Sequence, residues 1–464
     1  MPGSSRYFSS SRVFTAAAPG GAPATVEVDS ASGRVKRIHA GRPLQRSELA
    51  DAVADEDWID VGDRWILPGL VDAHVHLNEP GRTEWEGFET GTAAAASGGF
   101  TTVIDMPLNA IPPTTTVENL NIKLDASQGK LHIDCGFWGG VVPDNAQDLQ
   151  PLASQGVKGF KGFLCESGVE EFPGIKEEHV LRAMKELDAA KSLFLFHAEL
   201  DGSGHDHESV DPAAYSTFLE SRPPALEESA IDLIIRCARQ YPALRTHIVH
   251  LSASSALPAL RHARKELGLP LSVETCFHYL CLSAEQIAQG KTLFKCCPPI
   301  RNDANRELLW QALVDGDIDF VVSDHSPCTT ELKRLESGDF VKAWGGIGGL
   351  GLGLSLLWTE ASKRGISMAK VLEWVASKPA KQVGLEKQKG TIQEGADADF
   401  VVFDPSQTFK VTKDELHFKN RASPYEGLEL TGAVQDTYLR GQRVYSRGSG
   451  FSRGEAKFAG QRLL

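Results

Sequence analysis

The middle of the chain alternates between short apolar segments and longer stretches that mix polar and apolar residues. The apolar, β-rich segments lie near residues 68–76, 100–105, 131–138, 157–164, 193–199, 246–251, 270–276 and 318–323. The clearest helical stretches between them are 177–190, 227–240, 254–267 and 305–314. Strand–helix alternation repeated about eight times predicts an α/β fold, a (β/α)8 barrel. A doubly wound open sheet is the alternative, but no Gly-x-Gly-x-x-Gly follows a strand to support a dinucleotide site.

The two ends of the chain have a different pattern. Short strands with turns are indicated at 24–28 and 35–38, and the same pattern returns at 399–404 and 437–444. We expect residues 1–66 and 391–464 to pair as a small β-sandwich domain beside a barrel that spans residues 67–390. A length of 464 residues is sufficient for a large barrel and a second domain.

The charge and cysteine content restrict the class of protein. A formal net charge of −13 argues against a nucleic-acid or anionic-membrane surface. The eight cysteines are scattered and form no Cys-x-x-Cys pair, which favours a reducing compartment. We therefore expect a cytoplasmic protein. A peroxisomal or mitochondrial location stays open, because the Ser- and Arg-rich residues 1–12 lack acids, as transit peptides do.

The segment 68–82 carries the first chemical signal. His74 and His76 lie two residues apart, near the end of an apolar run that a Glu-Pro-Gly turn at 79–81 interrupts. On a strand, residues two apart point to the same face, so the two imidazoles would project side by side, as a metal site requires. Two ordinary buried histidines explain a lone His-x-His equally well.

Further ligand-type residues recur where later strands end. They are Lys161, His197, His250 and Asp324. Active sites of barrels lie at the carboxyl ends of the strands, so these side chains and the two earlier histidines would meet there. The histidines and the aspartate suit a divalent metal, with zinc as the expected ion. Lys161 is the exception, because a protonated amine repels cations; from the residues alone it is a surface lysine or a salt-bridge partner.

Several longer segments carry a resemblance to a known family. They are residues 74–88, 105–114, 295–301 and 323–327. With them the chain resembles, over nearly its whole length, the cyclic amidohydrolase (dihydroorotase-like) branch of the amidohydrolase superfamily. The resemblance implies a barrel enzyme with two zinc ions that hydrolyses a small cyclic amide. It also implies a homotetramer. From the acidic net charge we expect neither a nucleic-acid nor a membrane partner.

The resemblance also assigns residues. His74, His76 and Asp324 would hold the more buried metal ion, and His197 and His250 the second. Lys161 matches the position that is N6-carboxylated in the family, where the carbamate bridges both ions. Asp324 would be the general base, taking a proton from the attacking water and passing it to the leaving nitrogen. The substrate contacts implied by the family are Asn78, Asn109, Cys297 and Ser326.

Asn78 discriminates among the members of this branch. Dihydroorotases have an arginine at this position, which binds the carboxylate of their substrate. An uncharged amide suits a ring without a carboxylate, so the resemblance implies hydrolysis of allantoin to allantoate in purine breakdown. Dihydroorotase and hydantoinase (dihydropyrimidinase) activity are the alternatives, followed by a non-catalytic scaffold of the same fold and a phosphate-binding barrel. Phe277 stands where relatives usually have proline.

Overall fold

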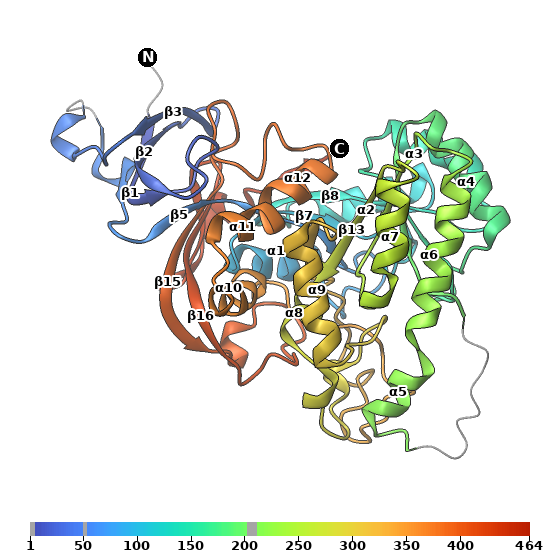
Figure 1. The fold of residues 1–464 in the computed structure, drawn as a ribbon. Coiled ribbons are helices and arrows are strands. Elements are labelled where there is room, and N and C mark those ends of the chain that lie inside the picture. Colours follow the sequence, from blue (N-terminus) through green and yellow to red (C-terminus); the bar gives the residue numbers. More distant parts are fainter. Residues whose placement is uncertain (1–4, 50–52, 202–210) are drawn as a thin grey trace.

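Parallel strands in the middle of the chain close into a barrel. The computed structural model describes residues 5–49, 53–201 and 211–464 (Figure 1). The barrel strands are β6 (Leu70–Val75), β7 (Phe100–Asp105), β8 (Asp134–Phe137), β9 (Gly139–Gly140), β10 (Phe160–Phe163), β11 (Leu193–His197), β12 (Arg245–Ile248), β13 (Leu271–Cys276) and β14 (Phe320–Val322). Only Trp138 separates β8 from β9, so these two together form the third of eight strand positions in the described chain.

The barrel closes between its first and last strands. Val75 at the end of β6 bridges His325, which follows β14, and the His76 N–H donates to the His325 carbonyl at 2.8 Å. Between these strands, β10 to β14 pair in parallel in sequence order. The predicted (β/α)8 barrel is confirmed, and the carboxyl ends of its strands face one common region.

Helices follow most of the barrel strands. They are α1 (Phe88–Ser97), α2 (Val117–Ser127), α3 (Leu149–Ser154), α4 (Glu177–Ala189), α5 (Tyr215–Ser221), α6 (Pro224–Ala238), α7 (Leu257–Lys265), α8 (Phe277–Cys281), α9 (Asp303–Asp315), α10 (Gly353–Lys363), α11 (Met368–Leu372) and α12 (Lys378–Gln382). The four predicted helices correspond to α4, α6, α7 and α9. Helix α9 illustrates why they begin and end where they do. The Asn302 side chain accepts from the Asn305 N–H at its start, and Gly316 ends it with a φ of 82°.

Both ends of the chain pair in one sheet, which Figure 1 shows in blue and red-orange beside the barrel. Its strands are β1 (Ser5–Val13), β2 (Ala22–Asp29), β3 (Arg34–Ala40), β4 (Trp58–Asp60), β5 (Trp65–Pro68), β15 (Phe400–Lys410), β16 (Glu429–Leu439), β17 (Gln442–Ser446) and β18 (Gly450–Phe451). Strand β5 joins the two ends by pairing antiparallel with β15. Phe8, Val26 and Phe400 are fully buried in the apolar cluster of this sheet.

The predicted pairing of the two ends is confirmed, whereas the domain boundaries at residues 66 and 391 stay a prediction. The last short strand, β19 (Arg462–Leu463), departs from the rest of the C-terminal region by pairing with β8 of the barrel. At the other end, β1 includes residues 5–12 of the Ser- and Arg-rich segment, and residues 1–4 of that segment lie outside the described chain.

A single residue, Gly69, separates β5 of the sheet from β6 of the barrel. Its N–H donates to the Asp399 carbonyl at 2.8 Å, and a Cβ atom at this position would lie 2.2 Å from Thr101 Oγ1. This close approach of another side chain to the backbone requires glycine. Sheet and barrel therefore meet without a loop, at the strand that carries His74.

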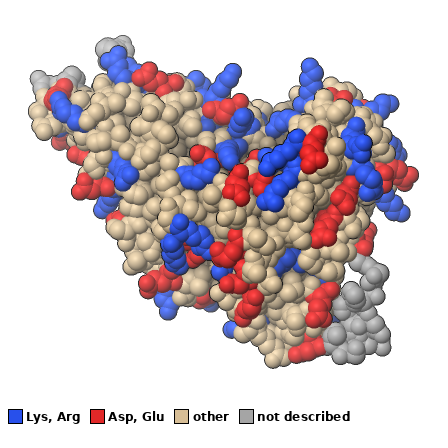
Figure 2. All heavy atoms as spheres, viewed as in Figure 1, with Lys and Arg blue, Asp and Glu red and all other residues tan. Residues whose placement is uncertain are grey.

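The surface carries charges of both signs. Figure 2 shows Lys and Arg side chains interspersed with Asp and Glu on one face of the molecule. Many of them form exposed ion pairs, such as Arg236 with Glu177 at 3.4 Å. Such pairs contribute little to stability, so the core and the buried polar groups dominate the energetics.

Candidate active site

All six predicted metal ligands line one cavity of about 290 Å³ at the carboxyl ends of the barrel strands. His74 lies within β6 and His76 directly follows it. Lys161 lies in β10, and His197 is the last residue of β11. His250 and Asp324 each come two residues after a strand, β12 and β14 respectively. The structure thus brings together residues from five strands that are up to 250 positions apart in the sequence.

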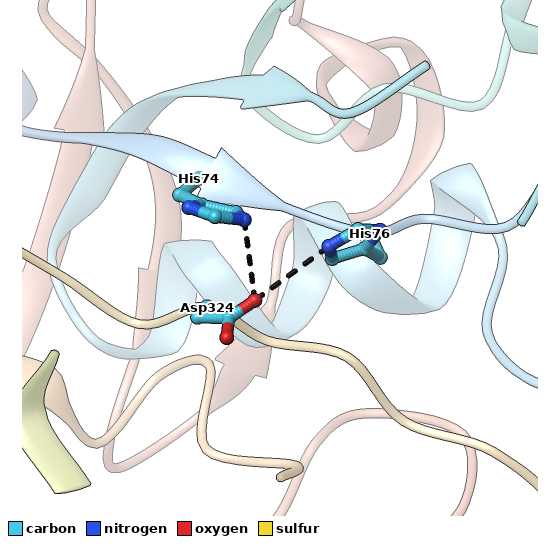
Figure 3. A group of neighbouring side chains, drawn as sticks. All are labelled: His74, His76 and Asp324. Carbon is cyan, nitrogen blue, oxygen red and sulfur yellow. Dashed lines mark ion pairs between the residues drawn. The ribbon is translucent and has the colours of Figure 1, made fainter. Parts of the chain in front are cut away.

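His74, His76 and Asp324 form the tighter part of this cluster. Asp324 Oδ1 lies 3.2 Å from His74 Nε2 and 3.6 Å from His76 Nε2 (Figure 3). All three side chains are buried. Two imidazole nitrogens and one carboxylate oxygen that converge in this way form a group that could hold a metal ion.

His197 and His250 form the other part. Their ring centroids lie 4.6 Å apart in an edge-to-face arrangement, and the His250 ring lies 5.5 Å from that of His74. The His197 ring stacks on Phe163 at 4.4 Å, and Lys161 Nζ lies 4.8 Å from the centre of the same phenyl ring. Phe163 therefore contacts both Lys161 and His197.

Lys161 is fully buried, and within the described residues it forms no ion pair. Burial lowers the pKa of this amine to about 8, although the carboxylates of Asp324 and Glu274 act in the opposite direction. A lysine in this environment loses its proton more easily than a surface lysine does. The interpretation of Lys161 as a surface residue or salt-bridge partner does not hold.

Two carboxylates behind the histidines were not found from the sequence. Glu274 on β13 places Oε1 2.5 Å from His74 Nδ1 and Oε2 3.0 Å from His247 Nε2. Glu199 places Oε2 2.9 Å from His197 Nε2, and the same oxygen accepts from Arg222 Nη1 at 2.5 Å. Contacts of this kind orient metal-ligating histidines. Glu199 had a local signal, because it follows His197 by two residues, whereas Glu274 had none.

Two buried histidine nitrogens of the cluster fit a bound cation. His74 Nε2 and His250 Nδ1 are buried, and neither has a hydrogen-bond partner in the part of the chain that the structure describes. Burial lowers the pKa of both imidazoles well below the usual value. Neutral imidazole is the form that binds metals. Unpaired buried nitrogens are costly, and a divalent ion would satisfy them.

Backbone strain accompanies the site. His250 and Asp324 have φ values of 41° and 43°, and Asn78 and Asn109 have 61° and 67°. Positive φ is unfavourable for residues with a Cβ atom and is concentrated at functional sites. Four of the residues with positive φ therefore have a predicted chemical role, whereas Lys191, Arg334 and Arg440, which also have positive φ, have none.

The four predicted substrate contacts fall into two groups. Asn109, Cys297 and Ser326 line the cavity, and Asn109 Nδ2 also lies 3.3 Å from His76 Nδ1. Asn78 does not line it; its side-chain amide is buried and donates to the Pro327 carbonyl at 3.3 Å. Asn78 thus supports the segment after Asp324. Phe277 begins α8, and its ring packs so closely on Gly353 that a Cβ atom there would lie 2.4 Å from it.

Comparisons with known proteins agree with this geometry. Residues 65–444 match the amidohydrolase family. The chain is 51% identical over 435 residues to a Saccharomyces cerevisiae protein named allantoinase, covering 93% of this chain and 94% of that one. It is also 51% identical over 393 residues to a Streptomyces avermitilis allantoinase, covering 84% and 86% of the two chains.

Among solved structures, the L-hydantoinase (dihydropyrimidinase) of Arthrobacter aurescens superposes with a TM-score of 0.88 at 27% identity, covering 98% of this chain and 99% of that one. No helix in the described residues is long and apolar enough to cross a membrane. The family match spans the barrel with all six candidate ligands, and the relatives align over most of their length. This chain belongs to the amidohydrolase family.

Proposed function

We propose that this chain hydrolyses the ring amide of allantoin to give allantoate. The observation that carries the proposal is the convergence of four histidines, Lys161 and Asp324 on one cavity, in a chain half identical to proteins named allantoinase. The predicted activity, a hydrolase acting on a cyclic amide, agrees with these relatives and with the hydantoinase fold. A cavity of about 290 Å³ is sufficient for a five-membered ring with one substituent.

Two divalent cations, expected to be zinc, are part of this proposal. His74, His76 and Asp324 would hold one, and His197 and His250 the other. Bound there, the cations would polarise the ring carbonyl and make water a stronger nucleophile at neutral pH. Lys161 would contribute to both sites as a carbamate. The ammonium first loses one proton; the neutral amine then forms an N–C bond with carbon dioxide and releases a second proton, which leaves an anionic oxygen ligand.

Asp324 is placed to move the proton. Its carboxylate lines the cavity next to His74 and His76. As water attacks the ring carbonyl, Asp324 would take its proton; when the C–N bond breaks, it would return that proton to the leaving nitrogen. Asn109, Cys297 and Ser326 would contact the substrate from the cavity wall. Asn78 would act indirectly, by supporting the segment that carries Asp324 and Ser326.

A substrate panel tests the activity. Purified protein, loaded with zinc in the presence of bicarbonate, is given allantoin, dihydroorotate and a 5-substituted hydantoin. We expect allantoate and little turnover of the other two. Preference for dihydroorotate or for the hydantoin would contradict the proposed substrate. Failure to bind any metal would indicate the non-catalytic scaffold instead.

The assembly and the compartment belong to the same proposal. We expect a homotetramer, which light scattering on the purified protein would test; a monomeric mass at micromolar concentration would contradict it. A cytoplasmic location is expected, with a peroxisome or mitochondrion as the alternatives. Imaging of the native protein in its own cells distinguishes these.

A further inference from the structure

A hydrogen-bonded network of side chains, here called the His247 network, lies behind His74. Glu274 Oε1 lies 2.5 Å from His74 Nδ1, and Glu274 Oε2 lies 3.0 Å from Nε2 of His247 on β12. The other ring nitrogen of His247, Nδ1, lies 2.8 Å from Ser272 Oγ on β13. Gln382 Nε2, at the end of α12, donates to the same Ser272 oxygen at 2.9 Å. These five residues connect α12 to a candidate metal ligand.

The pairing of β12 with β13 explains why these side chains meet. His247 is the register partner of Ser272 on the neighbouring strand. Ser272 and Glu274 lie two residues apart on β13, so their side chains point to the same face. That face is the inside of the barrel, because Glu274 contacts His74 of β6 there. Barrel interiors are normally filled by apolar side chains, and buried polar groups are costly unless they are paired. Both ring nitrogens of the fully buried His247 are paired in this way.

The donors and acceptors of the His247 network have a definite order. A carboxylate only accepts hydrogen bonds, so each imidazole proton lies on the nitrogen that faces Glu274, which is Nδ1 of His74 and Nε2 of His247. Burial lowers the pKa of His247 to about 3, so its ring is neutral and Nδ1 accepts from the Ser272 hydroxyl. The unprotonated Nε2 of His74 then faces Asp324, whose Oδ1 lies 3.2 Å away. This is the ring orientation and protonation that a metal ligand requires.

We propose that His247 is a positioning residue of the metal centre, which binds the second oxygen of Glu274 and thereby keeps His74 oriented with Nε2 toward Asp324. The inference rests on the zinc centre of the proposed function. Without the His247 N–H, one buried oxygen of Glu274 would lose its donor, and the carboxylate would no longer be held in position behind His74.

The far end of the network lies on the other side of the barrel. Ser272 and Gln382 line a separate pocket of about 490 Å³, together with Arg245 and Phe320, which begin β12 and β14. The orientation of His247 is therefore set from the amino ends of the strands, whereas its effect is at the carboxyl ends. A substitution at this position would act on metal binding without contacting the active-site cavity, which His247 does not line.

Two substitutions separate hydrogen bonding from packing. The His247 ring stacks on Phe320 with centroids 5.3 Å apart, and His247→Phe keeps an aromatic ring there but removes the N–H. His247→Gln loses the ring but keeps an amide N–H that can reach Glu274. We expect His247→Phe to weaken the affinity for one of the two zinc ions about 10–100-fold, measured by competition with a chelator, and His247→Gln to stay within about threefold of the wild type. A residue that only fills space would give the opposite order.

A double-mutant cycle tests whether His247 acts through Glu274. In a Glu274→Met background, His247→Phe should weaken zinc binding by less than about threefold further, because the contact that it removes is already absent. His132→Phe is the matched control. His132 is also buried, but it packs on Phe451 and Phe458 and does not line the cavity, so zinc affinity should be unchanged.

Wild-type zinc affinity in folded His247→Phe, equal losses in the two His247 variants, or additive losses in the cycle would overturn the role of His247. If His247→Phe does not fold, Ser272→Ala takes its place, because it removes the hydroxyl that orients His247; unchanged zinc affinity in that variant would overturn the inference as well. The proposed function fails separately. A wild-type protein that binds zinc but does not open allantoin would contradict the substrate and leave the role of His247 intact, whereas a protein that binds no zinc would contradict both.

Discussion

Two buried polar clusters lie at opposite ends of the barrel strands. The candidate metal-ligand cluster, at the carboxyl ends, consists of His74, His76, Lys161, His197, His250 and Asp324. In the described chain its His250 Nδ1 has no hydrogen-bond partner, and the ion-pair contact of His74 Nε2 with Asp324 Oδ1 at 3.2 Å is not a hydrogen bond. The other, here called the basal cluster, consists of Lys389, Asp134, Asp397, Asp399 and Arg440. Lys389 Nζ lies 2.6 Å from Asp134, 2.9 Å from Asp397 and 2.8 Å from Asp399. Asp134 also accepts from Arg440 Nη1 at 2.6 Å.

The three aspartates of the basal cluster are close enough together to hold a cation, as the metal-ligand cluster is. In the basal cluster, the Lys389 ammonium is the cation that these aspartates hold. Burial alone would lower the pKa of Lys389, but the surrounding carboxylates raise it above its usual value, so the ammonium stays charged. The basal cluster pairs its charges within the chain, whereas the candidate metal-ligand cluster leaves His250 Nδ1 without a hydrogen-bond partner among the described residues. This agrees with the rule that barrels place stability at the amino ends of their strands and chemistry at the carboxyl ends.

Lys161→Ala should have the largest effect, because it removes the proposed bridge between both halves of the metal-ligand cluster. We expect loss of bound zinc and of allantoin hydrolysis, with partial recovery when short carboxylic acids are added. Metal analysis and an allantoate assay measure both. Lys158→Ala, three residues earlier in the chain, is the control and should keep metal and turnover. Full metal content in Lys161→Ala would contradict the bridge.

Asp324→Asn should come next. Loss of a positioned general base costs roughly 10²–10⁴-fold in kcat. Most of the bound metal should stay, because the histidines are intact. Steady-state kinetics and metal analysis on the same preparation separate the two effects. A variant that remains fully active would exclude Asp324 as the base.

Lys389→Met tests the opposite end of the barrel. Removing one partner of a buried ion cluster costs about 3–5 kcal/mol in the free energy of unfolding. The kcat and KM of the folded protein should be unchanged, since the basal cluster takes no part in the chemistry. Urea unfolding measures the first quantity and allantoin kinetics the second. If Lys389→Met lost zinc at unchanged stability, the contrast between the two clusters would be wrong.

Glu274→Gln should have the smallest effect of the four. Glutamine keeps one oxygen near His74 but loses the negative charge, and changes of this kind reduce metal affinity about 10–100-fold. Zinc competition with a chelator measures the change directly. We expect the ion that dissociates first to bind more weakly than in the wild-type protein. The fold should stay intact by circular dichroism. Unchanged zinc affinity would make Glu274 a purely structural residue.

The fold could be predicted, and the candidate ligands could be brought to one cavity, because both have local signals. Apolar runs marked the strands, and polar residues followed directly where each strand ended, as for His197 and Asp324. The role of Lys161 came only from the resemblance, since a lone lysine has no local signature. The role of Glu274 could not be found from the sequence. It depends on a contact across the barrel, which joins Glu274 to His74 over 200 positions.

Asn78 illustrates a different limit. The sequence placed it correctly next to the site and beside a turn, but its side chain turns to Pro327 and does not line the cavity. Asn78 has a φ of 61°, so the chain changes direction there. Side chains alternate between faces only along an extended strand, so alternation from His74 and His76 does not predict where the Asn78 side chain points. Proximity in sequence to His74 and His76 therefore does not by itself place a side chain on the cavity wall.

Because only Gly69 separates β5 of the sheet from β6 of the barrel, the position of β5 also determines which β6 side chains face the cavity. Side chains alternate between faces along a strand, so inserting one residue between Gly69 and His74 would exchange the faces of all that follow. Ala73 and Val75 would then point into the cavity, and both histidines would point away from it. With no loop to absorb an added residue, a single codon inserted before Ala73 would turn two candidate ligands away from the cavity without changing either residue.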